Sequence, residues 1–298
     1  MFEFPISGVE TYWWLPVLTA FVISFFASLG GLSGAFLLLP FQISILGFTA
    51  PGVSSTNLLF NVIAIPSGVY RLWREKRMLW PLVAVITAGS IPGLFCGVII
   101  RVKYLPDPSH FKLFAGLALL YLGLKLLTDI IKNQDSNKSK PANSGFNVTE
   151  VKFGLARISY RFNDADFSIP TVAVFLLSTL IGIVGGIYGV GGGAFLVPIL
   201  VTIYGLPIYT IAGAALASTF MASLVGVIFY TGIAPLFAST ELSARPDWLL
   251  GLMLGLGGML GIYFGSRTQR YMPVRAIKII LMICIMIAAL KYILNFIF

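Results

Sequence analysis

Long apolar stretches dominate the sequence and set the strongest limit on its fold. Eight of them approach the ~20 residues that a helix needs to cross ~30 Å of hydrocarbon. In lipid, a helix satisfies its own backbone hydrogen bonds, and the alternating pattern of barrel strands is absent from the sequence. We therefore expect an all-α polytopic membrane protein with long helices at about 12–29, 51–70, 80–100, 111–131, 169–187, 208–230, 248–266 and 275–297.

Two further apolar pieces, 34–47 and 193–204, are shorter. At 1.5 Å per residue they reach only roughly 20 Å. We expect these two pieces to form short helices that either cross steeply or turn back inside the membrane.

The composition excludes a water-soluble enzyme. Apolar residues make up 58% of the 298 residues and charged residues only 10%, whereas a soluble domain is about one-quarter charged. The sequence contains no metal-ligand spacing, nucleophile–base arrangement or phosphate-binding loop. We expect no catalytic residue, metal or cofactor, and we attribute the net charge of +9 to membrane orientation rather than to a nucleic-acid partner.

The basic residues predict how the chain is oriented. Most Lys and Arg residues fall in 71–79, 132–168 and 267–275, whereas the N-terminal tail, 101–110 and 231–247 hold few. Because basic loops stay in the cytoplasm, we place the first set inside and the N-terminus outside. The chain then divides into a first transmembrane repeat (1–132), a polar cytoplasmic linker (133–168) and a second transmembrane repeat (169–298).

The linker has two parts. Residues 133–145 have the composition of a flexible tether. Residues 151–162 alternate weakly between apolar and polar side chains, which is typical of a strand pair or of a segment lying on the lipid surface. A solvated tether is the simpler interpretation of the whole linker.

The two halves of the chain resemble each other. GLSGAFLLLP (31–40) aligns with GVGGGAFLVP (189–198) at an offset of 158, and Trp80, Gly89, Gly93 and Gly97 align with Trp248, Gly257, Gly261 and Gly265 at an offset of 168. Each half holds five helical pieces, and the number of crossings per half is odd whether the short piece crosses or turns back. The second repeat should therefore be inverted, an arrangement that places a transporter's substrate site at the repeat interface.

Paired glycine clusters interrupt the first helix of each half. Glycine lets the backbone leave a helix, and the N-terminal end of the short helix that follows favours an anion. The simpler alternative is that small residues only let helices pack closely. On the first interpretation, the candidate substrate-binding residues are Gly31, Ser33, Gly34, Gly189, Gly191, Gly192 and Gly193.

A polar stripe follows the first short helix. Ser54, Ser55, Thr56 and Asn57, with Asn61 beyond them, offer hydroxyl and amide donors to an anion, although such side chains also cap helices and join helices to each other. The aligned residues of the second half are Ala212, Gly213, Ala214, Ala215 and Thr219, with Ser218 and Ser223 as nearby substitutes. We expect an asymmetric site, and we interpret Pro40 and Pro198 as hinges or kinks.

Acidic side chains are missing from the deep parts of the predicted spans. A cation pathway or proton relay normally contains an intramembrane acid, so the sequence favours an anionic or neutral solute. The two cysteines, Cys96 and Cys284, are ordinary buried thiols on the simplest interpretation. A redox pair is the alternative.

At these residues the chain resembles the TauE/SafE sulfite exporter family, also called the 4-toluene sulfonate uptake permease family. The resemblance is carried by GIVGGIYGVGGGAFLVPILVTIYGLP (182–207) and by its first-half counterpart SLGGLSGAFLLLPFQISILGFTAPG (28–52). The family's Gly-Thr-Ser-like patch is similar to Ser55-Thr56-Asn57, whereas Gly213-Ala214-Ala215 keeps only the glycine. The resemblance implies a membrane protein that moves sulfite, sulfonates, sulfoacetate or similar organic anions.

Together these features predict a secondary transporter for a small oxyanion in the cytoplasmic membrane. The two halves would rock about a site between the paired breaks and the polar stripe. A passive anion channel, a membrane thiol-redox protein using Cys96 and Cys284, and a non-transporting scaffold are the alternatives. The expected partners are the solute and membrane lipid.

Overall fold

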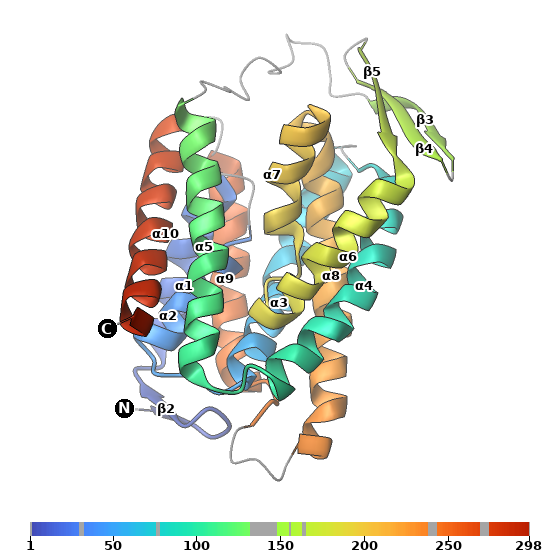
Figure 1. Ribbon diagram of the computed structural model, residues 1–298. Helices are drawn as coiled ribbons and strands as arrows, with labels where there is room; N and C mark the ends of the chain where they lie inside the picture. Colours follow the sequence, from blue (N-terminus) through green and yellow to red (C-terminus); the bar gives the residue numbers. More distant parts are fainter. Residues whose placement is uncertain are drawn as a thin grey trace.

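The computed structural model is a helical body with a small β-sheet at each end (Figure 1). It describes residues 2–29, 33–75, 78–131, 148–154, 156–162, 165–237, 243–268 and 274–297. The helices in these ranges are α1 (Trp14–Leu29), α2 (Ala35–Ser44), α3 (Gly52–Arg74), α4 (Trp80–Lys103), α5 (Pro108–Ile131), α6 (Thr171–Tyr188), α7 (Gly193–Tyr204), α8 (Ile208–Ile233), the 3₁₀ turn η2 (Ala234–Phe237), α9 (Trp248–Thr268) and α10 (Val274–Ile297).

Six helices of the described chain are long and apolar enough to cross a membrane by length and composition. Large apolar side chains such as Leu18, Leu180 and Ile228 are exposed on the outside of the body, as expected of a surface that faces lipid rather than water. The chain is therefore a multi-pass helical membrane protein. The six segments are Trp80–Lys103, Pro108–Thr128, Thr171–Tyr188, Thr210–Leu236, Trp248–Thr268 and Ile279–Phe296.

The two remaining predicted long spans, 12–29 and 51–70, form helices of a different character. Helix α1 has only 16 residues. Helix α3 has 23 residues, but it carries the polar stripe and ends with Arg71 and Arg74. The predicted short pieces form α2 and α7, with 10 and 12 residues.

The short hairpin at the N-terminal end ties the chain to a distant helix. Strands β1 (Phe2–Phe4) and β2 (Val9–Thr11) pair antiparallel. Between them, the Ser7 backbone N–H and hydroxyl both donate to Asp247 Oδ2, at 3.0 and 2.6 Å. The other oxygen of Asp247 accepts from the Leu250 N–H at 3.0 Å and caps the start of α9.

The linker contributes a three-stranded antiparallel sheet at the opposite end, with strands β3 (Val148–Phe153), β4 (Arg157–Phe162) and β5 (Ala165–Pro170). Alternate residues of β4, including Tyr160, are buried. Burial raises the pKa of the Tyr160 phenol to about 12, and its oxygen lies 2.9 Å from Thr210 Oγ1 at the start of α8. The strand alternative for 151–162 is thus the one observed, β5 is additional, and residues 133–145 lie outside the described residues.

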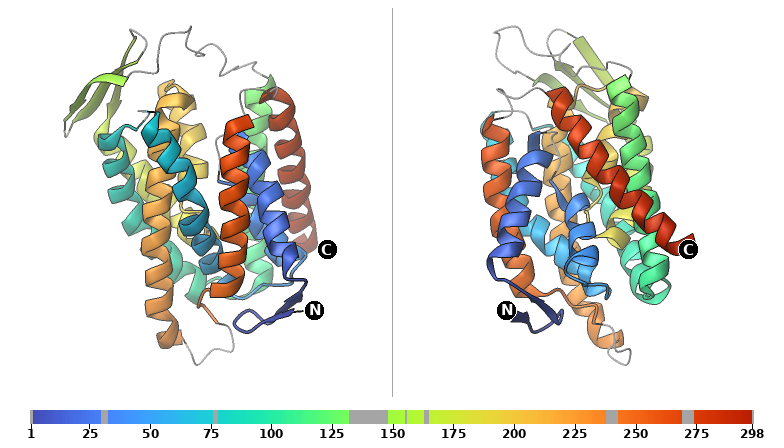
Figure 2. Two further views of the ribbon diagram at one scale, coloured as in Figure 1. Left: turned by 180° about the vertical axis from the view of Figure 1, so that it is seen from behind. Right: turned by 90° about the vertical axis from the view of Figure 1, so that its left-hand side faces the viewer.

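Figures 1 and 2 show that α1 and α6, the first helices of the two halves, start at opposite ends of the body. Helix α1 starts at the end of the body that carries the N-terminal hairpin, and α6 starts at the end that carries the linker sheet. Helix α7 then runs back toward the linker sheet, where α8 begins. Both chain termini lie at the same end of the body.

Glycine stripes join α4 to α6 and α9 to α1 at equivalent positions. An added Cβ at Gly93 would lie 2.0 Å from Thr179 O, and one at Gly261 would lie 2.4 Å from Phe21 O. These helices can approach so closely only because glycine lacks that atom. Each contact of one stripe has a counterpart in the other, with the glycines 168 residues apart and their partners 158 residues apart. The contacts of the α4–α6 stripe are Gly89–Phe175, Gly93–Thr179 and Gly97–Ile183, and those of the α9–α1 stripe are Gly257–Val17, Gly261–Phe21 and Gly265–Phe25.

This packing exchanges one helix between the halves. Helices α1 and α3 pack against α9, with α2 on α1 and α3, while α6 and α8 pack against α4, with α7 on α6 and α8. The two groups, hereafter the α9 bundle and the α4 bundle, meet where α3 contacts α8. Helices α5 and α10 pack against each other.

Candidate functional site

Both predicted helix breaks are present in the structure. Helix α1 ends at Leu29 and α2 begins at Ala35, while α6 ends at Tyr188 and α7 begins at Gly193. The residues that precede α2 and α7, Gly34 and Gly192, have φ angles of 82° and 86°, which glycine adopts without the strain of a side chain. In each break this glycine's carbonyl accepts from two N–H groups of the following turn, those of Leu37 and Leu38 or of Phe195 and Leu196.

The first break is described only in part. Ser33 is buried beside Gly34, whereas Gly31 lies outside the described residues. Pro40 and Pro198 lie inside α2 and α7, at the sixth position of each. Their hinge role stays a prediction.

Asn57 on α3 connects the two breaks. Its Nδ2 group donates to Ala35 O at 3.0 Å, at the first break, and to Gly189 O at 3.1 Å, at the second. Gln42 Nε2 donates to Asn57 Oδ1 at 3.3 Å. A second link runs from the Tyr188 hydroxyl to Phe36 O at 2.8 Å. The structure thus brings together two glycine clusters that lie far apart in the sequence.

The rest of the polar stripe also donates to protein acceptors. Ser54 Oγ donates to Ile187 O at 2.8 Å, Ser55 Oγ to Ala244 O at 2.9 Å, and Thr56 Oγ1 to Gly52 O at 2.7 Å. All three side chains are completely buried. In this conformation the structural use of the stripe is therefore realised, and a ligand would have to replace these carbonyl acceptors.

The second break packs directly on backbone. An added Cβ at Gly189 would lie 2.3 Å from Ser54 O, and one at Gly193 would lie 2.8 Å from Ala215 O. The Gly193 N–H donates to Thr219 Oγ1 at 3.1 Å. Glycine is required at both positions because no side chain fits. Gly213, the remaining candidate of the second half, is buried in α8.

The model of the family described as Sulfite exporter TauE/SafE matches residues 16–292, a range that contains both breaks. The chain belongs to the TauE/SafE family. Members of this family are membrane transporters, which implies a small anionic solute. No curated protein and no solved structure matches the chain.

Several buried oxygens around the breaks of this TauE/SafE protein have no hydrogen-bond partner within the described ranges. Ser24 Oγ lies 3.1 Å from the position of a Cβ added to Gly34, and Ser223 Oγ lies 2.7 Å from that of Gly191. Asn61 Nδ2 donates to Val190 O at 3.1 Å, but its Oδ1 is unpartnered, as is Gln42 Oε1. A buried polar group without a partner is costly. The two hydroxyls could donate to an anion, whereas the two amide oxygens can only accept.

Arg101 is a site residue that the sequence did not reveal. We assigned it to the 101–110 loop, but α4 continues to Lys103 and buries the Arg101 side chain completely. Its Nε donates to Ser54 Oγ at 3.3 Å, so the guanidinium adjoins the polar stripe. The signal in the sequence was an arginine directly following the apolar run 94–100.

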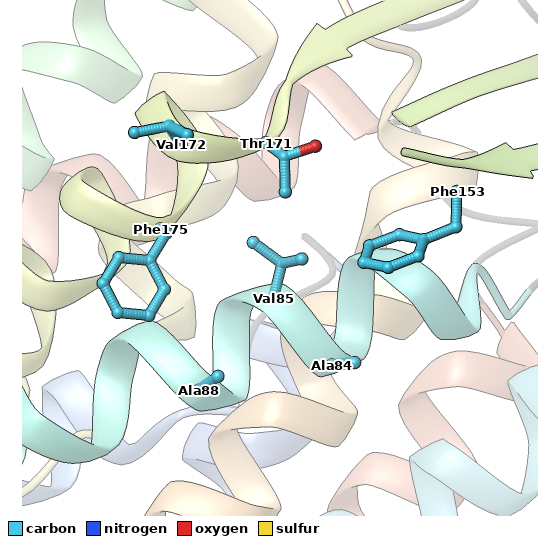
Figure 3. Close-up of a pocket in the computed structure, with 7 residues that line it drawn as sticks. All are labelled: Ala84, Val85, Ala88, Phe153, Thr171, Val172 and Phe175. Atoms are coloured by element: carbon cyan, nitrogen blue, oxygen red, sulfur yellow. The ribbon is translucent and has the colours of Figure 1, made fainter. Parts of the chain in front are cut away.

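An apolar cavity of about 340 Å³ lies apart from the breaks, between α4, the start of α6 and the linker sheet (Figure 3). The one hydroxyl in its lining, that of Thr171, donates to Gly154 O at 2.8 Å. The cavity therefore offers no free donor to an anion. It is lined by Ala84, Val85, Ala88, Phe153, Thr171, Val172 and Phe175.

The two cysteines lie on different helices, Cys96 on α4 and Cys284 on α10, and both thiols are free and exposed. The described residues contain no group of three or more His, Cys, Asp or Glu side chains placed to hold a metal ion. The interpretation of both cysteines as buried thiols is wrong, because both are exposed. The redox pair stays an alternative.

Proposed function

We propose that this TauE/SafE family member is a secondary transporter for a small oxyanion, such as sulfite, a sulfonate, sulfoacetate or a related organic anion. The observation that carries the proposal is the double contact of Asn57 with Ala35 O and Gly189 O. It joins two interrupted helices inside an apolar body, where irregular backbone is tolerated only beside protein or a water-filled path.

The proposed architecture has two inverted repeats, 1–132 and 169–298, separated by the linker 133–168. In each repeat the first helix and the short helix form a re-entrant hairpin, and three helices cross. In this proposal α3 crosses despite its polar stripe, and α6 turns back at the break although it is long and apolar enough to span. The equivalent glycine contacts of the α4–α6 and α9–α1 pairs support this repeat. The opposite starting ends of α1 and α6 support the inversion (Figure 1).

We place the linker sheet in the cytoplasm and the N-terminus outside. The basic segments support this orientation because they gather at one end of the body. Arg71 Nη1 donates to Ser266 Oγ at 2.9 Å, which joins the ends of α3 and α9, and the linker sheet with Arg157 and Arg161 lies at that same end (Figure 1). Basic residues on the cytoplasmic side of the cytoplasmic membrane follow the usual bias.

The solute site in this proposal lies between the breaks. The N-terminal ends of α2 and α7 supply partial positive charge, and the hydroxyls of Ser24 and Ser223 supply donors that have no protein acceptor in the described chain. The candidate residues around them remain those of the glycine clusters and the stripe from Ser54 to Asn57. These stripe donors would exchange carbonyl acceptors for the oxygens of the anion.

Alternating access in this proposal is a rocking of the α9 bundle against the α4 bundle. The boundary between them runs along the α3–α8 contact and through the Asn57 bridge. Because the bundles exchange α4 and α9, the moving bodies differ from the two sequence halves.

Uptake into proteoliposomes tests the proposal. Labelled sulfite, methanesulfonate, sulfoacetate and acetate should enter faster than into protein-free liposomes, and unlabelled anion inside should accelerate uptake of at least one of them. Protein-dependent uptake without this counterflow would indicate a channel. Uptake at the protein-free rate for every anion would contradict the proposal, and an unchanged rate in the Cys96→Ser/Cys284→Ser variant would eliminate the redox alternative.

A further inference from the structure

Arg101 places a complete positive charge inside the helical body. Its side chain is fully buried near the end of α4. The guanidinium donates from Nε to Ser54 Oγ at 3.3 Å, from Nη2 to Thr49 O at 3.3 Å, and from Nη1 to Leu105 O. Its Cζ also lies 3.7 Å from the centre of the Phe111 ring. All four partners are neutral.

No carboxylate contacts Arg101 within the part of the chain that the structure describes. Carbonyl oxygens and an aromatic ring solvate a guanidinium in part, but they do not neutralise it. A buried charge without a countercharge is costly, and an ionisable side chain at membrane depth usually serves a function. Nothing in the described residues supplies that countercharge, and a bound anion would offset the cost of burying Arg101.

A single side chain, that of Ser54, connects the guanidinium to the second break. Ser54 Oγ, which accepts from Arg101, donates to Ile187 O at 2.8 Å, and the Ser54 carbonyl packs on Gly189. Tyr230 on α8 donates to Gly186 O at 2.9 Å, close to the end of α6. A negative solute at the break would therefore lie within the field of Arg101.

We infer that Arg101 is the anion-binding charge of this transporter, an inference that rests on the proposed function. A guanidinium has five N–H donors, and the structure uses three of them in hydrogen bonds. Its planar fork matches two oxygens of a carboxylate or sulfonate, which a compact ammonium group does not. Arg101 thus selects an oxyanion over a spherical halide.

Binding of methanesulfonate and chloride to the purified full-length protein in lipid nanodiscs tests this inference. Arg101→Gln should weaken methanesulfonate binding at least tenfold. Lys103→Gln, which removes an exposed charge two residues away, should leave the dissociation constant within twofold of the wild type. An Arg101→Gln protein that is monodisperse and binds methanesulfonate as well as the wild type would overturn the inference.

If Arg101→Gln does not fold, the Arg101→Lys variant tests the inference instead. It keeps the charge and removes the fork, so the preference for methanesulfonate over chloride should fall at least fivefold. An unchanged preference would mean that Arg101 only holds the turn between α4 and α5. If the wild-type protein bound and transported no anion, the proposed function itself would fail, and this outcome is distinct from that of the Arg101 variants.

Discussion

The two halves of the molecule hold the short helix against the following long helix in different ways. In the first half, Asn57 on α3 spans the gap to the first turn of α2 through its bond to Ala35 O. The equivalent residues in the second half are Ala215 and Gly193, and there the two backbones touch because neither residue has a side chain that separates them. Both arrangements hold a short helix against the following long one.

On the proposed alternating access, this difference favours the first half as the part that changes shape. Close backbone contact leaves little freedom, since any added atom collides with a carbonyl. A side-chain amide can rotate and exchange its acceptors at a modest net cost, because each hydrogen bond contributes only about 1 kcal/mol. We therefore assign the adjustable contacts to the first half and the rigid contacts to the second.

Gly189→Ala should have the largest effect, because Gly189 combines a positive φ with direct packing on the Ser54 backbone of the other half. The new Cβ would meet Ser54 O at 2.3 Å, and the residue has a φ of 81°. Strain at positive φ and overpacking together should lower the free energy of unfolding by about 4 kcal/mol. The measurement is unfolding in mixed micelles by SDS titration. Gly205→Ala is the control, since its φ is 63° but nothing lies within 4 Å, and equal losses in the two variants would contradict the explanation.

Gly93→Ala and Gly261→Ala should each cost about 3 kcal/mol, because each new Cβ would meet a carbonyl of the partner helix. These two positions are equivalent between the halves, so their losses should agree within about 1 kcal/mol in the same titration. Gly232→Ala, where nothing lies within 4 Å, should be neutral or slightly stabilising. A large difference between the paired variants would show that the two glycine stripes are not equivalent.

Asn57→Ala should cost about 2 kcal/mol, because it leaves the carbonyls of Ala35 and Gly189 without their shared donor. Asn61→Ala should cost about half as much, since Asn61 donates only to Val190 O and its Oδ1 is unpartnered. The same titration measures both. If Asn61→Ala were the more damaging change, the bridge between the breaks would not be the main adjustable contact.

Ser24→Ala and Ser223→Ala should have the smallest effect on stability, within about 0.5 kcal/mol of the wild type. Neither hydroxyl has a partner to lose within the described chain. Methanesulfonate affinity should nevertheless fall in both, because these hydroxyls face the breaks. Wild-type affinity in both variants would remove them from the proposed site.

The sequence predicted the breaks well because their cause is local. A run of glycines between two apolar helices leaves few other structures, and Gly34 and Gly192 adopt the positive φ angles that such a run permits. The family followed from the same residues. The strand pattern of 157–162 was also visible, because alternation with a period of two is a local signal.

The remaining features depend on partners that are distant in the sequence. Whether Ser54 or Asn57 has a free donor depends on the carbonyls of α2 and of the second break, which no local pattern reports. The sequence placed Arg101 in a loop because Lys103 and Pro106 follow it closely. Its burial results from contacts with α3 and α5, which lie elsewhere in the chain. The exchange of α4 and α9 likewise became visible only from the packing.

That exchange has a consequence for biogenesis. When the first half leaves the ribosome, the face of α1 that will contact the glycine stripe of α9 has no partner, because α9 has not yet been synthesised. The stripe on α4 must likewise wait for α6. Neither half can reach its final packing alone. We therefore expect two co-expressed fragments, split within 133–147, to assemble with each other, and each fragment expressed alone to be degraded by the cell's quality-control proteases.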